Sequence, residues 1–134
     1  MSTEQHQVTS ELLQQLFDAF NQHDLEGVWS LMTDDIVFEG AAGPEAFGAR
    51  FIGREAVGAA FEGVWKTFPD VQWANDSHFV SNGLGVSQWT LVGTREDGVK
   101  IEADGVDLFS FRDGKIASKK AFRKDRPMIE PANS

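Results

Sequence analysis

The sequence predicts an α+β fold in which a curved antiparallel sheet wraps around three N-terminal helices. Apolar residues recur at helical spacing in the first half of the 134-residue chain, and strand-like alternation follows Pro69. Short turns that contain Asn-Gly or Asp-Gly separate the predicted strands, as in β-hairpins. A twisted sheet around helices has a concave face, which is a natural site for a pocket.

Three segments of the first half have helical patterns. The first starts at Thr9 or Ser10, either of which can cap a helix, and it ends at the polar segment 21–24. Asp24 can cap a second, short helix, and a third runs over residues 54–68 and ends before a proline. The apolar positions of the first and third helices are Leu12, Leu13, Leu16, Phe17, Phe20, Val57, Ala60, Phe61, Val64 and Trp65.

Strand patterns account for most of the remaining chain. Ile36–Glu39 is the first predicted strand, and the Gly- and Ala-rich segment 40–53 is predicted to be a loop, either a lid over the pocket or a plain connector. This loop lacks the pattern of a phosphate-binding loop. The tail from Asp125 contains two prolines and is expected to be loose. Four further strands, expected to form an antiparallel meander, cover residues 71–80, 84–94, 99–111 and 115–124.

The composition argues against several classes of function. Cys is absent, so the chain has no disulfide, thiol nucleophile or Cys-based zinc site, and the three His residues lack metal-ligand spacing. We therefore expect no metal and no cofactor. The net charge of −9 argues against nucleic acid as a partner. No apolar stretch reaches about 18 residues, which argues against a membrane span, and the N-terminus lacks signal-peptide features. We expect one domain over residues 1–134, with an ordered core at about 8–126, in a cytoplasmic protein.

Asp107 is the strongest candidate for a functional residue. Alternation in the strand 99–111 places it with small and aromatic residues, as in a pocket wall; these are Ala103, Gly105, Phe109 and Phe111. Burial would raise the pKa of an isolated carboxyl there, which would make Asp107 a general acid, or a base near neutral pH. The alternative is a structural Asp that backbone N–H groups or an ion pair satisfy.

The following strand carries cations on both faces. Alternation groups Lys119 and Arg123 on one face with Ala117 and Ala121. The other face has Ile116, Ser118, Lys120, Phe122 and Lys124. If the first face lines the pocket, Lys119 or Arg123 can pair with Asp107 or with an anionic group of a substrate, and such a pair would lower the pKa of Asp107. The alternative is a solvated edge strand, since lysines protect exposed sheet edges.

Three stretches carry a resemblance to a known family. They are "FDAFNQHDLEGVWSLMTDDIVFEG" (residues 17–40), "FIGREAVGAAF" (51–61) and "GVDLFSFRDGKIASKKAF" (105–122). The chain from Leu12 to Phe122 resembles the nuclear-transport-factor-2-like superfamily, in particular its SnoaL-like polyketide cyclase and ketosteroid-isomerase-like group. The resemblance implies a cone-shaped, cystatin-like α+β barrel and a homodimer that packs sheet to sheet.

The resemblance also assigns individual positions. Ketosteroid isomerases of this superfamily use a carboxylate base, a Tyr and a protonated Asp. Asp107 matches the protonated Asp, whereas Leu16 stands at the Tyr and Gly40 at the base. Glu39 adjoins the base position, but a shift of one residue moves a strand side chain to the other face. Polyketide cyclases and limonene-epoxide hydrolases have an Asp where this chain has Ala121. The chain therefore keeps one catalytic residue of these enzymes and lacks the others.

His78 and Trp89 complete the candidates. His78 is either an acid–base group of the pocket or a packed residue, and Trp89 is either pocket wall or core. The predicted catalytic residues are Asp107, Glu39 and His78. The predicted substrate-binding residues are Lys119, Arg123, Trp89, Ala121, Phe109, Phe38, Phe61 and Trp65.

These residues predict a cofactor-free enzyme of the isomerase or cyclase (lyase) kind, which transfers a proton on a small apolar carbonyl compound. The alternative is a non-catalytic module of the same fold, which binds a small hydrophobic ligand or mediates dimerisation.

Overall fold

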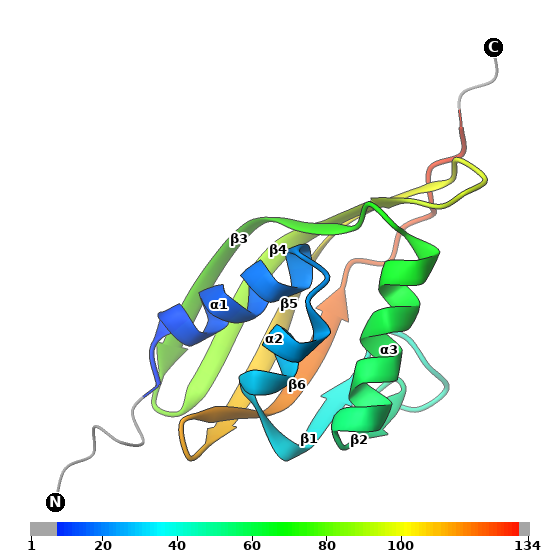
Figure 1. The fold of residues 1–134 in the computed structure, drawn as a ribbon. Coiled ribbons are helices and arrows are strands. Elements are labelled where there is room, and N and C mark those ends of the chain that lie inside the picture. The colour runs from blue at the N-terminus through cyan, green and yellow to red at the C-terminus, as the bar shows by residue number, and fades with distance from the viewer. Residues whose placement is uncertain (1–7, 132–134) are drawn as a thin grey trace, which may run out of the picture.

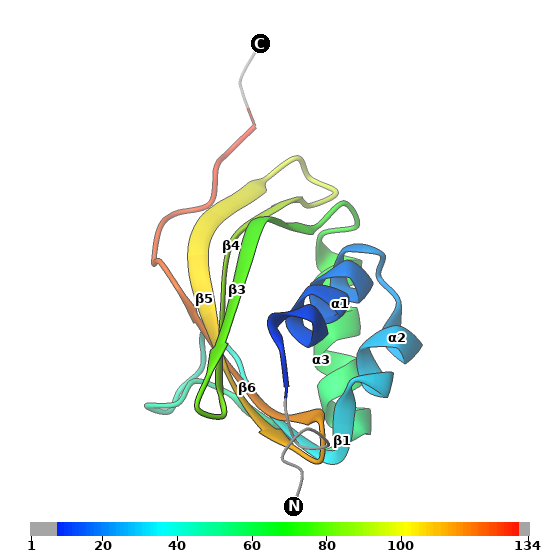
Figure 2. The ribbon, with the colours of Figure 1, turned by 90° about the vertical axis from the view of Figure 1, so that its left-hand side faces the viewer.

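The computed structural model describes residues 8–131, and it places three helices on the concave side of one curved sheet (Figures 1 and 2). The helices are α1 (Ser10–Asn21), α2 (Leu25–Ser30) and α3 (Arg54–Thr67). The strands are β1 (Met32–Glu39), β2 (Arg50–Ile52), β3 (Gln72–Ser81), β4 (Leu84–Thr94), β5 (Lys100–Arg112) and β6 (Lys115–Arg123). They lie in the order β2-β1-β6-β5-β4-β3. The predicted α+β cone around three N-terminal helices is confirmed.

The N-terminal half of the sheet differs from the prediction in two respects. β1 starts at Met32, four residues before the predicted strand, and β2 lies in the segment predicted to be a loop. β1 pairs with β2 antiparallel and with β6 in parallel, so the sheet is mixed. β2 escaped detection because it has only three residues and follows a Gly- and Ala-rich loop, which shows no alternation. Its Phe51 lies opposite Phe38 in the pairing, and the two rings stack at 5.8 Å.

The four C-terminal strands form the predicted antiparallel meander. Asn82 and Gly83 at the β3–β4 turn have φ values of 52° and 77°, and Asp113 and Gly114 at the β5–β6 turn have φ values of 54° and 76°. Positive φ at both central residues is the requirement of a type I′ hairpin turn, which Asn-Gly and Asp-Gly satisfy. These two dipeptides therefore fix the register of both hairpins.

Two register shifts change which side chains face the helices. In β3 the pairing with β4 shifts by one residue between Ala74 and Ser77, and Asn75 between them has a φ of 54°. In the β5–β6 pair a second shift lies next to Ser110. Because of this second shift, Ile116 is fully buried in the core, whereas uninterrupted alternation placed it on the other face.

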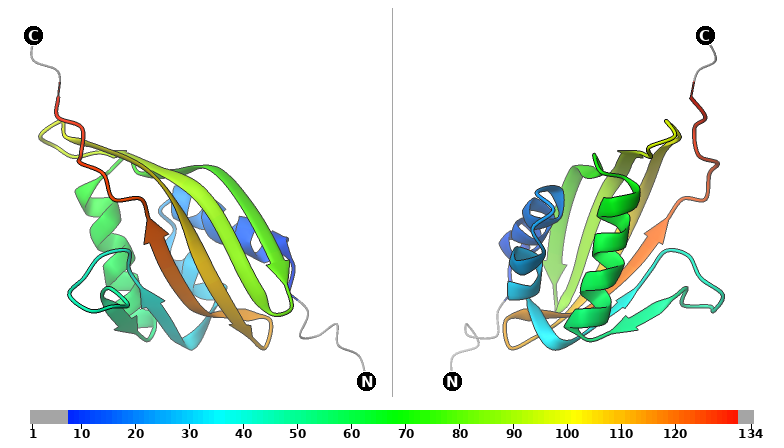
Figure 3. Two further views of the ribbon diagram at one scale, coloured as in Figure 1. Left: turned by 180° about the vertical axis from the view of Figure 1, so that it is seen from behind. Right: turned by 45° about the vertical axis from the view of Figure 1, so that its right-hand side comes forward.

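The helix starts and the tail complete the fold. Asp24 caps α2 as predicted, since its Oδ1 accepts a hydrogen bond from the N–H of Gly27 at 3.0 Å. Thr9 is the N-cap residue of α1, without a side-chain capping bond. The segment after β6, expected to be loose, forms two backbone hydrogen bonds between Ile129 and Lys100, and it runs beside the β4–β5 turn (Figure 3). Among residues 8–131, no helix combines the length and apolar character that a membrane crossing requires.

Candidate functional site

Asp107 lies at the centre of the concave face and has no exposed surface. Its Oδ2 accepts a hydrogen bond from the indole N–H of Trp89 at 2.9 Å, and its Oδ1 accepts one from the Nζ of Lys119 at 3.2 Å. The partners come from the two strands that flank β5, since Trp89 belongs to β4 and Lys119 to β6. The sheet therefore surrounds one buried carboxyl with two donors.

The position of Trp89 depends on Gly105. The two residues are opposite each other in the β4–β5 pairing, two residues before Asp107 on β5. A Cβ atom at Gly105 would lie 2.4 Å from the Cη2 of Trp89, much closer than non-bonded atoms approach. The absence of a side chain at Gly105 thus lets the indole lie against β5, where its N–H reaches Asp107.

Lys119 is almost fully buried, and its charge is surrounded by aromatic rings as well as by Asp107. Its Nζ lies 4.6 Å from the ring centroid of Phe38, 5.4 Å from that of Phe20 and 5.7 Å from that of Phe61. Ring faces at such distances attract an ammonium ion. The three rings belong to α1, β1 and α3. Together with β6, these three elements therefore form the site of the Lys119 ammonium.

The environment of Asp107 has opposing effects on its proton affinity. Burial raises the pKa of the Asp107 carboxyl above its ordinary value of 3.8, while the charge of Lys119 and the N–H groups of Trp89 and Lys119 act in the opposite direction. The net direction is upward. Asp107 therefore holds its proton at higher pH than an exposed Asp does.

A second polar group lies on the same face of the sheet. Ser87 on β4 is directly opposite Asp107, and His78 on β3 is directly opposite Ser87. On the other side, Asp107 is opposite Ala121 on β6. One row across four strands therefore contains His78, Ser87, Asp107 and Ala121, which includes three of the residues that the sequence singled out.

The comparison to protein families assigns most of the chain to one family. The family model of the SnoaL-like domain matches residues 13–119, which is most of the chain. The chain belongs to the SnoaL-like domain family. The predicted membership of the nuclear-transport-factor-2-like superfamily is thereby confirmed. No curated protein matches the chain significantly.

Solved structures support the fold of this SnoaL-like domain. A protein from Pseudomonas putida KT2440, provisionally assigned as a polyketide cyclase, is 17% identical, with 90% of this chain and 92% of that chain covered and a TM-score of 0.75. TerC, crystallised with polyporic acid, is 20% identical, with 85% and 89% covered and a TM-score of 0.71. A protein with a ketosteroid isomerase-like fold from Catenulispora acidiphila DSM 44928, in complex with trimethylamine, is 15% identical, with 85% of each chain covered and a TM-score of 0.74. At these identities the similarity shows the fold alone.

Several candidates of the SnoaL-like domain lie away from Asp107. Glu39 pairs with Arg50 at 2.8 Å and shares a face of the sheet with Lys120, since Phe38 next to it faces the helices. Arg123 is exposed at the end of β6. Trp65 on α3 is buried, and its ring stacks at 5.3 Å on the ring of His23, which lies between α1 and α2. Phe109, by contrast, is close to Asp107, two residues further along the same face of β5, and it is part of the core.

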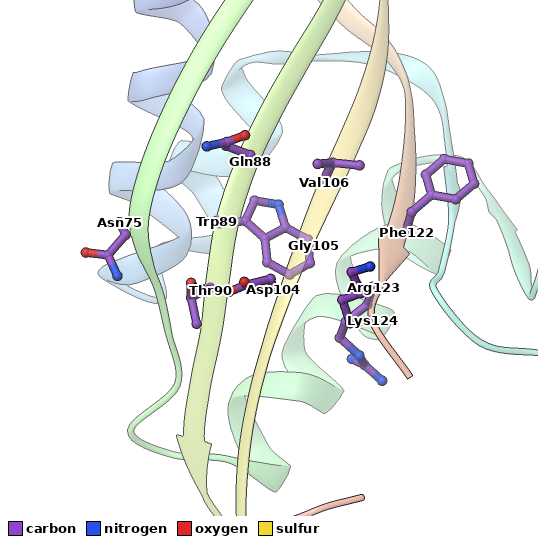
Figure 4. Close-up of a pocket in the computed structure, with 10 residues that line it drawn as sticks. All are labelled: Asn75, Gln88, Trp89, Thr90, Asp104, Gly105, Val106, Phe122, Arg123 and Lys124. Atoms are coloured by element: carbon purple, nitrogen blue, oxygen red, sulfur yellow. Dashed lines mark hydrogen bonds between the residues drawn. The ribbon is translucent and has the colours of Figure 1, made fainter. Parts of the chain in front are cut away.

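The structure also has a hollow of about 480 Å³ on the outer side of the sheet, which faces away from the helices (Figure 4). Arg123 lines it together with outward residues of β4, β5 and β6, for example Gln88, Val106 and Phe122. Asp107 does not line this hollow. The hollow and the buried carboxyl therefore belong to opposite faces of the sheet, and only Trp89 and Gly105 take part in both.

Sequence reasoning missed Asp76 and Ser87, which hold His78. His78 Nε2 lies 2.8 Å from Oδ2 of Asp76, and His78 Nδ1 lies 2.7 Å from Oγ of Ser87. No motif marks these residues, because the contacts depend on the register shift in β3. Within residues 8–131, no group of three or more His, Asp or Glu side chains could hold a metal ion.

Proposed function

We propose that this SnoaL-like domain is a cofactor-free isomerase- or cyclase-like enzyme that transfers a proton on a small, largely apolar carbonyl compound. The observation that carries the proposal is the buried Asp107 with its donors Trp89 and Lys119. A carboxyl whose pKa is raised by burial exchanges protons nearer to neutral pH, where general acid–base catalysis is most effective.

The residues around Asp107 suit the charges of such a reaction. Removal of a proton next to a carbonyl group places negative charge on the carbonyl oxygen. Asp107 would exchange the proton, and the ammonium of Lys119 would stabilise the oxyanion in place of the Tyr that this chain lacks. The rings of Phe38 and Phe61 beside Lys119 offer an apolar surface to the rest of the substrate.

Ligands of the structural neighbours support small-molecule binding. TerC was crystallised with polyporic acid, and the Catenulispora acidiphila protein was solved in complex with trimethylamine. These molecules are evidence for binding by those proteins, and they make a small organic ligand a reasonable expectation for this one.

The proposal can be tested by proton exchange. The protein is incubated in D₂O with cyclohexanone, and the loss of the α-proton signals is followed by ¹H NMR. We expect Asp107→Asn to lower the exchange rate by about 100-fold or more, the usual contribution of a general acid–base group. Asp113→Asn is the matched control, because it neutralises an exposed carboxylate and keeps a residue that suits the β5–β6 turn. Equal rates for the wild type and Asp107→Asn would refute the catalytic role.

The outer face of the sheet favours a second function, which is dimerisation. Phe79 and Phe122 are 63% and 51% exposed on this face, and Phe122 lines the hollow of Figure 4. Exposed aromatic residues next to a hollow are typical of interaction surfaces. The complete burial of Asp107 also suits a module whose function lies on its outer face. We propose that two chains pack these faces together in a homodimer.

Light scattering coupled to size-exclusion chromatography tests the dimer. The chain has a mass of 14.8 kDa, so a dimer gives about twice that value. Phe122→Lys should convert the dimer to the monomer, whereas a substitution in the turn, Asp113→Asn, should not. A wild-type mass equal to that of one chain at micromolar concentration would refute the dimer.

A further inference from the structure

Asp76, His78 and Ser87 form a hydrogen-bonded chain that leads from the surface to the row of Asp107. The exposed fraction of the side chain is 21% for Asp76 and 5% for His78, and Ser87 is fully buried. The two bonds of the chain, 2.8 Å from Asp76 to His78 and 2.7 Å from His78 to Ser87, have normal lengths. The polar groups of this chain therefore connect solvent with the interior.

A register shift in β3 places His78, the middle residue of this hydrogen-bonded series, on the concave face. Trp73 faces the core, so uninterrupted alternation would put residues 75, 77 and 79 beside it and His78 on the outer face. The register shift between Ala74 and Ser77 reverses this pattern. Asn75, at a φ of 54°, is a residue type that tolerates the left-handed conformation. Bulges often re-aim side chains next to functional sites.

The partners of His78 define how its protons are arranged. An ionised Asp76 can only accept, so the Nε2 of His78 carries a proton. In the neutral ring Nδ1 is then an acceptor, and Ser87 donates its hydroxyl proton to it. A hydroxyl bound to an imidazole that a carboxylate orients is an activated hydroxyl, whatever the fold on which it occurs.

Other contacts hold the same arrangement from α1. Gln14 donates a hydrogen bond to Oδ2 of Asp76 at 3.2 Å, and the ring of Phe17 lies 5.1 Å from the His78 ring. Asp76 is the one ionisable partner that bonds to His78 within the described chain. The imidazole is thus enclosed by an apolar ring, one carboxylate and one hydroxyl.

Ser87, the last residue of the hydrogen-bonded series, lies next to Asp107. The two residues are directly opposite each other on β4 and β5 and face the same side. Opposite residues of an antiparallel pair have Cβ atoms about 4.5–5.5 Å apart. The Ser87 hydroxyl and the Asp107 carboxyl therefore lie side by side on the concave face.

We propose that Asp76, His78 and Ser87 are a second acid–base unit of the site, which works on the same carbonyl substrate as Asp107. Ser87 would contact the substrate and accept a proton from its carbon atom while passing its own proton to Nδ1 of His78. The C–H electron pair forms the carbon–carbon double bond of an enolate, and the ammonium of Lys119 stabilises the resulting oxyanion. His78 returns its proton through Ser87 in the second half of the reaction. Asp76 acts as a positioning residue.

This proposal rests on the proposed function for its substrate, but its first test does not. The three His rings are labelled with ¹⁵N, and His78→Gln identifies the signals of His78 in the long-range ¹H–¹⁵N spectrum. We expect the neutral ring of His78 in the wild type to carry its proton on Nε2 alone. In Asp76→Ala, which removes the acceptor for Nε2, we expect a mixture of both tautomers. A wild-type ring with its proton on Nδ1, or an unchanged tautomer in Asp76→Ala, would overturn the proposal.

The second test is the exchange of cyclohexanone α-protons in D₂O. Ser87→Ala and Asp76→Asn should each lower the rate by about 100-fold, as expected for loss of a general acid–base partner. Ser110→Ala, which removes a hydroxyl bonded to Ser118 on the outer face of β5, should leave the rate unchanged. If Asp107→Asn is inactive and both Ser87→Ala and Asp76→Asn exchange at the wild-type rate, the proposed function stands and the second unit is wrong. If the wild type shows no exchange, the proposed function fails, and the tautomer of His78 still decides whether the hydrogen-bonded unit exists.

Discussion

Loss of one charge from the buried pair of Asp107 and Lys119 should destabilise the fold more than loss of both. At 3.2 Å the two charges attract each other by about 5 kcal/mol at an effective dielectric constant of ~20. Desolvation of each ion costs several kcal/mol, so the net contribution of the pair is small. A single substitution removes the attraction and leaves the desolvation cost of the remaining charge.

The three variants are Lys119→Met, Asp107→Asn and the double variant. Lys119→Met should lower the free energy of unfolding by about 3–5 kcal/mol, the usual cost of an unpaired buried charge. Asp107→Asn should cost less, because its side-chain oxygen still accepts the Trp89 bond and the three rings around Lys119 still attract the ammonium. The double variant should lie within about 1 kcal/mol of the wild type, since no charge remains buried.

Urea unfolding followed by tryptophan fluorescence and circular dichroism measures these free energies. All variants are compared at one protein concentration and at pH 7, because dimerisation makes stability depend on concentration. A double variant whose destabilisation equals the sum of the two single effects would refute the reasoning, since it would show that the two charges do not interact.

Two further predictions concern a surface carboxylate and a glycine. Hydrogen bonds from Thr94 hold the pKa of Asp70 below 3.8, so the stability that Asp70 contributes is present above about pH 4 and is lost as the pH falls through its folded-state pKa. In Asp70→Asn the free energy of unfolding, measured by urea unfolding between pH 2 and 7, should therefore fall less as the pH is lowered than it does in the wild type. The same fall in both proteins would contradict this. Gly105→Ala should lower the free energy of unfolding by about 1–3 kcal/mol, because the added Cβ collides with the ring of Trp89 and with the backbone oxygen of Phe122. Gly63→Ala on α3, where nothing lies within 4 Å of the added atom, should instead raise it by about 0.5–1 kcal/mol, and equal effects at the two glycines would argue against the steric explanation.

The face of Asp107 could be predicted because β5 alternates regularly up to that residue. Ala103, four residues before Asp107, and Phe109, two residues after it, are both buried as expected. This pattern is local, so it needs no knowledge of the neighbouring strands. The hairpin turns could also be predicted from local sequence, because the dipeptides Asn82-Gly83 and Asp113-Gly114 are typical of type I′ turns.

The pairing of Lys119 with Asp107 could not be decided from the sequence. A strand rich in lysine resembles a protected sheet edge, and β6 would be an edge if the sheet ended with the meander. The structure places β1 on its other side, with Phe38 opposite Lys119. Phe38 and Lys119 are about 80 positions apart in the sequence and belong to a parallel strand pair. No local sequence pattern predicts such a contact.

The environment of His78 was hidden for a different reason. Its face depends on a one-residue register shift in β3, and the only local sign of that shift is Asn75 with its positive φ. An Asn in a strand is compatible with many structures. Asp76 and Ser87 therefore became candidates only when the pairing of β3 and β4 was known.

The titration of the Asp107 carboxyl tests the account most directly. The ¹³C signal of its carboxyl carbon is followed by NMR as a function of pH, with Asp107→Asn for the assignment. We predict a midpoint above 3.8, because burial outweighs the opposing effects of Lys119 and Trp89, and a further upward shift in Lys119→Met, because the charge of Lys119 lowers the pKa. A midpoint at or below 3.8 would contradict the role of Asp107 as an acid–base group.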